Sequence, residues 1–73
     1  MEMTIYTIYS NPLDYPGKYV VRRSIIREGG LHVAVEPDAV VDSLLEARSH
    51  IPDSLFRMPR VPHDDPCIVE SWL

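Results

Sequence analysis

The residues best suited to chemistry lie near the C-terminus, where His63, Asp64 and Asp65 are followed by Cys67. Their side chains could in principle hold a metal ion or form a small hydrolytic centre. A closed metal site, however, usually needs four ligands with hydrogen-bonded outer partners, and a nucleophilic cysteine needs a lowered pKa. Asp-Asp-Pro between prolines is typical of a turn in which carboxylates accept from free backbone amides. We therefore expect no catalytic residue, no metal site and no cofactor in a protein that is not an enzyme.

A second set of candidate residues is acidic and lies in the middle of the chain. Between positions 36 and 53 the sequence has one cation, Arg48, so that this segment alone carries the net charge of −4 found for the whole chain. Its carboxylates belong to Glu36, Asp38, Asp42, Glu46 and Asp53. We expect them to form the principal electrostatic surface and to bind a protein partner that has a basic, nucleic-acid-binding groove. Direct binding of nucleic acid is not expected of so acidic a chain.

Three of these acidic residues, Asp38, Asp42 and Glu46, recur at every fourth position. On a continuous helix their carboxylates would line up at intervals of ~5 to 6 Å. This spacing approaches that of phosphates along a strand, so the row could mimic nucleic acid. The alternative is a favourable interaction with the helix dipole, because the residues lie just before or within the first turn of the expected helix. The sequence leaves both interpretations open.

The only helix that the pattern predicts convincingly lies within residues 37–52. Ser43 and Glu46 fit a capping box, in which the Ser43 hydroxyl accepts from the amide of Glu46 and the Glu46 carboxylate reaches back to the amide of Ser43. A proline, Pro52, then ends the helix. A start at Asp38 is the alternative, and the reciprocal box favours Ser43. The apolar positions that follow share one face of this helix: Leu44, Ala47 and Ile51.

The rest of the chain has the patterns of strands and turns. Residue types and alternation predict strands at 3–9, 19–27, 31–36 and 67–73. Residues 53–66 contain three prolines and are expected to form an extended connection. These elements predict one α+β domain over residues 1–73, with the order β-β-β-α-β, an antiparallel sheet and one helix packed on one of its faces. We expect the first or the last strand at a sheet edge, where an open edge favours a homodimer.

Composition restricts the environment of the protein. The single cysteine, Cys67, excludes an intramolecular disulfide and fits a reducing compartment. The N-terminal residues lack the basic and apolar regions of a signal peptide, and no run approaches the ~20 apolar residues that cross a bilayer. We therefore expect a cytoplasmic protein that binds no membrane.

Three stretches of sequence carry a resemblance to a known class of proteins: NPLDYPGKYVVR at 11–22, SLLEAR at 43–48 and DDPCIVESW at 64–72. With these stretches the chain resembles the small phage-type anti-CRISPR proteins, in particular inhibitors of the type I-C surveillance complex. The resemblance implies a small acidic inhibitor that stops the crRNA-guided complex from engaging DNA, by occlusion or by mimicry of nucleic acid. It assigns a role to no residue, because these proteins share no common motif.

A second class of function stays open from the residues alone. The chain could be a bacterial housekeeping or stress protein that acts as an interaction subunit through pairing of sheets. The contact surface is open too, because the sheet face that bears Tyr6, Tyr19 and Arg23 could serve in place of the acidic segment.

Overall fold

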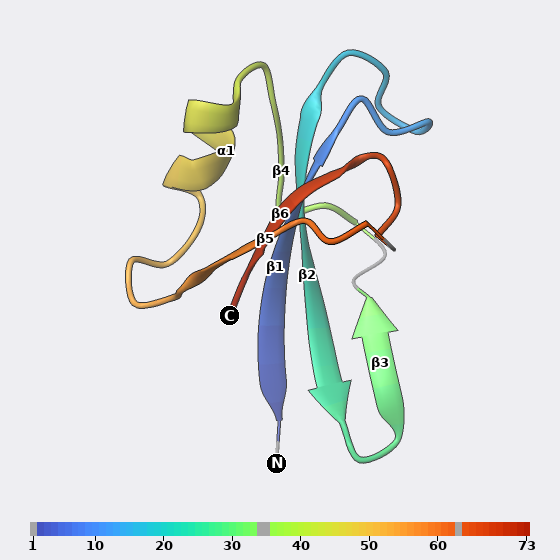
Figure 1. The fold of residues 1–73 in the computed structure, drawn as a ribbon, viewed down its shortest axis with the longest axis vertical. Helices are drawn as coiled ribbons and strands as arrows, with labels where there is room; N and C mark the ends of the chain where they lie inside the picture. Colours follow the sequence, from blue (N-terminus) through green and yellow to red (C-terminus); the bar gives the residue numbers. More distant parts are fainter. Residues whose placement is uncertain (1, 34–35, 63) are drawn as a thin grey trace.

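The computed structural model describes residues 2–33, 36–62 and 64–73. It contains one antiparallel sheet and one short helix, α1 (Leu44–Ser49) (Figure 1). The strands are β1 (Met3–Ser10), β2 (Tyr19–Arg27), β3 (Gly30–Val33), β4 (Ala39–Val41), β5 (Arg57–Pro59) and β6 (Ile68–Trp72). The predicted α+β class, with an antiparallel sheet and one helix, is confirmed.

The spatial order of the strands is β3-β2-β1-β6-β5, and β4 also pairs with β2. Strand β2 is paired with β1 over the whole length of β1. On its other side β3 pairs with residues 24–27 of β2 and β4 with residues 19–21. Strands β3 and β4 therefore form one interrupted outer row, and β5 forms the opposite edge.

The structure corrects the predicted order and edges. Two short strands, β4 and β5, are added to the β-β-β-α-β order, and β5 lies in the segment that was expected to be an extended connection. Strand β4 forms because the β-branched pair Val40-Val41 suits a strand paired with β2. Strands β1 and β6 pair on both sides, so neither is an edge as predicted. Part of the third predicted strand, at positions 34 and 35, lies outside the described residues.

The helix begins where the capping pattern places it. Ser43 is the N-cap, in extended conformation, and its hydroxyl oxygen accepts from the amide of Glu46 at 3.1 Å. This bond provides an acceptor for one of the backbone N–H groups that have no partner within the first turn of a helix. Within the described part of the chain, no bond returns from the Glu46 carboxylate to Ser43, so only half of the capping box is present. The start at Ser43 places Asp38 outside the helix.

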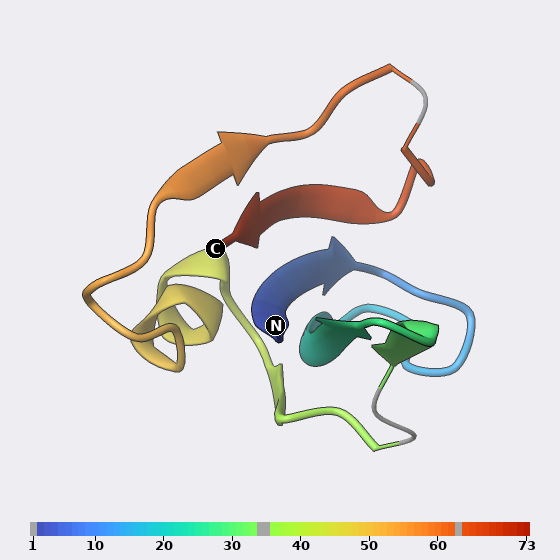
Figure 2. The ribbon, with the colours of Figure 1, turned by 90° about the horizontal axis from the view of Figure 1, so that it is seen from below.

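The core lies between the helix and one face of the sheet. Ile8 and Val21, which are register partners in β1 and β2, are fully buried together with Ala47 of α1, and Ile51 is 7% exposed. Figure 2 shows α1 on one side of the curved sheet. The apolar helix face predicted from the sequence is the face that covers this core.

Candidate functional site

The structure distributes the five acidic candidates over the segment before β4, the connection from β4 to α1, the helix itself and the turn after it, without a continuous helical row. Asp38 precedes β4, and its carboxylate lies 3.9 Å from Nε of Arg23 in β2. Asp42 follows β4 and pairs with Nζ of Lys18, from the loop before β2. Both carboxylates are thus partly neutralised by cations of the β2 region. The equal spacing of Asp38, Asp42 and Glu46 does not line them up, because a strand lies between the first two.

The other three acidic candidates keep exposed charges. Glu36 lies before β4, Glu46 in the first turn of α1, and Asp53 in the turn after the helix. All three are exposed, and in the described ranges none of them forms an ion pair. The position of Glu46 suits the positive end of the short helix. Whether these residues bind a partner stays a prediction.

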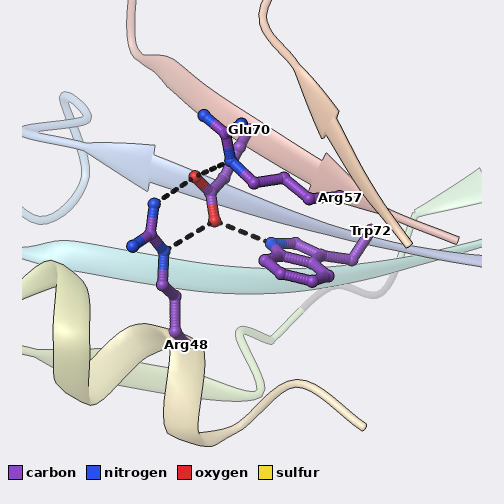
Figure 3. A network of polar contacts seen from close by, with 4 residues as sticks. All are labelled: Arg48, Arg57, Glu70 and Trp72. Carbon is purple, nitrogen blue, oxygen red and sulfur yellow. Dashed lines mark hydrogen bonds and ion pairs between the residues drawn. The ribbon is translucent and has the colours of Figure 1, made fainter. Parts of the chain in front are cut away.

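The most strongly organised polar group in the protein is Glu70, which the sequence did not single out. It lies in β6 opposite Ile8 and is completely buried. Arg48 of α1 donates to it twice, from Nε to Oε2 at 3.0 Å and from Nη2 to Oε1 at 2.8 Å. Arg57 of β5 donates from Nε to Oε1 at 3.0 Å, and Trp72 from Nε1 to Oε2 at 2.7 Å (Figure 3).

These bonds keep the buried carboxylate ionised. The hydrogen bond from Arg48 is the largest influence, and together with those from Arg57 and Trp72 it outweighs burial and lowers the pKa of Glu70 from 4.5 to about 2. The same bond raises the pKa of Arg48. Each carboxylate oxygen accepts two hydrogen bonds. These bonds offset the free-energy cost of removing the charged carboxylate from water.

The Glu70 cluster, defined as Glu70, Arg48, Arg57 and Trp72, joins the three consecutive elements α1, β5 and β6. It attaches α1 and the edge strand β5 to β6, which lies between β1 and β5 in the sheet order. A sequence signal for it existed, because Glu70 alternates with the apolar residues Ile68 and Trp72 on one strand face and would need a cation there. What the sequence could not supply was the identity of that cation.

The C-terminal turn that held the candidate metal or hydrolytic residues is built by backbone capping. Oδ2 of Asp64 accepts from the amide of Val61 at 3.0 Å, and Oδ1 of Asp65 accepts from the amide of Cys67 at 2.8 Å. Burial, followed by the charge of Asp65, raises the pKa of the Cys67 thiol, which disfavours a thiolate nucleophile. His63 lies outside the described residues. Among the residues described, no group of three metal-ligating side chains occurs.

The alternative surface with Tyr6, Tyr19 and Arg23 is mostly covered. Tyr6 and Tyr19 pack against the core beneath the helix, so their rings do not form an open stacking surface. Arg23 is half-exposed and lies near Asp38. The two rings are only partly exposed, and whether this face contacts a partner stays a prediction.

Comparison with known proteins places the chain in no family. No protein-family model matches it, and neither the curated proteins nor the solved structures searched include a significant match. Within the described part of the chain, α1 is too short to span a membrane.

Proposed function

We propose that the protein is a small, non-enzymatic, cofactor-free inhibitor that binds a protein partner through its acidic segment. This proposal is supported by the pairing of Arg48, the one cation in the segment. Arg48 donates to buried Glu70, so its charge is paired with that carboxylate and not with the acidic side chains of the segment. Glu36, Glu46 and Asp53 therefore present negative charge that this arginine does not neutralise.

Such a surface suits a partner with a basic groove that normally holds nucleic acid. Exposed charges of one sign steer association and make it sensitive to salt, chiefly through the on-rate. The resemblance to phage-type anti-CRISPR proteins suggests that the partner is a subunit of a crRNA-guided surveillance complex, of type I-C, in the cytoplasm of a bacterial host. Blocking of DNA engagement would then follow from occupation of the groove.

The test compares two triple variants with the same change in net charge. Glu36→Gln, Glu46→Gln and Asp53→Asn remove the exposed charges of the segment, whereas the control, Glu2→Gln, Asp14→Asn and Glu28→Gln, removes charges elsewhere. We expect the first variant to bind the purified surveillance complex roughly tenfold more weakly and to lose inhibition in an interference assay, while the control retains both.

Two outcomes would contradict the proposal. If the folded segment variant bound and inhibited as the wild type does, the acidic segment would not be the contact surface. If the wild-type protein failed to bind or inhibit any surveillance complex of this type, the anti-CRISPR proposal itself would be wrong. Circular dichroism of both variants serves as the control for folding.

A second candidate function, an interaction subunit that pairs through its sheet, is favoured by the outer edge of β3. The amide of Asn11 donates to Lys18 O at 2.8 Å on the β1 side, and the amide of Asp38 donates to Val21 O at 2.8 Å on the other side. The N–H and C=O groups of successive residues in a strand point to opposite sides. In β2 these groups therefore point toward β3 and β4 at odd-numbered residues and toward β1 at even-numbered residues. The backbone groups of Leu31 and Val33, whose partners in β2 are even-numbered, therefore point outward.

The opposite edge is closed to such pairing. Phe56 and Leu73 exchange both backbone hydrogen bonds, at 3.0 and 3.2 Å, so the next residues with outward backbone groups in β5 are Arg57 and Pro59. Proline has no N–H to donate, which interrupts the edge. Strand β3 has no such block within Gly30–Val33, so self-pairing of two copies at β3 would give a homodimer.

Light scattering tests the homodimer with a single pair of variants. Leu31→Pro removes an outward N–H without removing a bond to β2, whereas Leu31→Ala keeps the N–H and removes the exposed apolar side chain. We expect the proline variant alone to shift a concentrated sample toward monomer. A wild-type protein that is monomeric at every concentration would eliminate this candidate.

A further inference from the structure

The two arginines of the Glu70 cluster have hydrogen-bonding capacity that the carboxylate does not use. Arg48 engages Glu70 through Nε and Nη2, and Arg57 through Nε alone. Among the described residues, Nη1 of Arg48 and both terminal nitrogens of Arg57 have no hydrogen-bond partner. The side chains are 41% and 50% exposed, so these nitrogens can reach molecules in solution.

The arrangement of these nitrogens is fixed by the fold. Figure 3 shows Arg48 and Arg57 approaching one carboxylate from α1 and β5, with their terminal nitrogens on the side away from the Trp72 ring. Glu70 is fully buried, so it holds both guanidinium groups to the body of the protein. Most of the entropy that a flexible arginine loses on binding a ligand is therefore already lost on folding.

The charge of the cluster favours an anion. Two guanidinium groups surround one carboxylate, which leaves a net positive charge at the surface of an acidic protein. Guanidinium groups present N–H donors in a planar fork that matches the oxygens of phosphate and carboxylate groups. A tetrahedral anion has enough acceptor oxygens to contact both forks at once.

We propose that Arg48 and Arg57, held by Glu70, form a binding site for a phosphate-type oxyanion. Glu70 acts as a positioning residue, and the terminal nitrogens of the two arginines are the contacts. Arg48 lies within the acidic segment, but the site is defined by its pairing and that of Arg57 with Glu70, and phosphate binding there does not depend on the function proposed above.

Nuclear magnetic resonance of the arginine side chains tests the site with inorganic phosphate as the probe. At constant ionic strength, with chloride as the comparison salt, we expect phosphate at millimolar concentrations to shift the Nε–H signals of Arg48 and Arg57 in a saturable way. Arg27 is the matched control, because it is also about half-exposed and donates from Nε to a carboxylate, that of Glu2, at 2.8 Å. Its signal should not saturate.

Two variants give the site a second readout. Arg57→Lys keeps a cation beside Glu70 but loses the fork, so we expect phosphate binding to weaken severalfold, while Arg27→Lys should leave it unchanged. The site would be supported if phosphate binding weakened only in the Arg57→Lys variant and the amide spectrum of that variant were unchanged. Equal shifts at Arg27 and at the cluster, or no saturable shift up to tens of millimolar phosphate, would overturn it as adventitious ion pairing.

Discussion

Glu70 and Asp42 are both carboxylates paired with cations, but they differ in burial and in the number of side chains that donate to them. Glu70 is buried and accepts from three side chains of three elements. Asp42 is 73% exposed and pairs with Lys18, which is itself 46% exposed. Water and salt weaken the second pair, whereas the first acts in an environment from which water is largely excluded. The buried carboxylate therefore serves the fold, and the exposed ones remain available for binding.

The largest expected effect is that of Glu70→Gln. The amide keeps the size of the side chain and one acceptor oxygen, but it removes the charge and places an NH2 group against two of the donors that the second carboxylate oxygen served. Loss of one member of a buried ion pair typically costs ~3 to 5 kcal/mol, and exposure of the arginines places this variant near the lower end. Urea unfolding should show a midpoint far below that of the wild type. A midpoint within error of the wild-type midpoint would show that buried Glu70 contributes no more to stability than an exposed carboxylate.

The pH dependence of stability also distinguishes Glu70 from the exposed carboxylates. The pKa of Glu70 falls from 4.5 to about 2 on folding, so its contribution is present above pH 4.5 and is lost as the pH falls toward 2. At about 1.4 kcal/mol per pKa unit this amounts to roughly 3 kcal/mol. Wild-type stability should therefore decline steeply over this window, and that of Glu70→Gln much less. Parallel curves for the two proteins would show that other carboxylates cause the decline.

An intermediate effect is expected when the arginines are changed one at a time. Arg48→Lys loses a two-point contact and Arg57→Lys a single one, so the first should cost more, about 1 to 2 kcal/mol against about 1 kcal/mol. Thermal or urea unfolding of the two variants measures the difference. If Arg57→Lys were the more damaging, attachment of β5 rather than of α1 would be the main role of the cluster.

The smallest effect belongs to Asp42→Asn. Exposed ion pairs of this kind contribute about 0 to 1 kcal/mol, and added salt reduces that further. We expect an unfolding midpoint close to that of the wild type in urea at moderate salt. A loss comparable with that of Glu70→Gln would mean that the exposed carboxylates also hold the fold.

The sequence predicts those parts of the structure that depend on local rules. The Ser43 cap, the strands β1 and β2 and the apolar face of α1 follow from neighbours in the chain, and the structure has them. Strand β5 was missed, because its pairing depends on β6 and not on its own proline-containing sequence.

The Glu70 cluster was missed for the same reason. Each of its arginines looks in isolation like an ordinary exposed cation, and only contacts between different elements show which of them pair with Glu70. The acidic segment could be found by counting charges, but its division by β4 and its pairing with Lys18 and Arg23 depend on contacts distant in sequence.

The central claim, that Glu70 is a buried carboxylate held ionised by Arg48, Arg57 and Trp72, can be measured directly. Carbon-detected nuclear magnetic resonance would follow the carboxyl carbon of Glu70 while the pH is lowered. We predict that its chemical shift stays at the value of the ionised carboxylate as the pH is lowered and changes in the folded protein with a midpoint at about 2. A midpoint at or above 4.5 in the folded protein would contradict it.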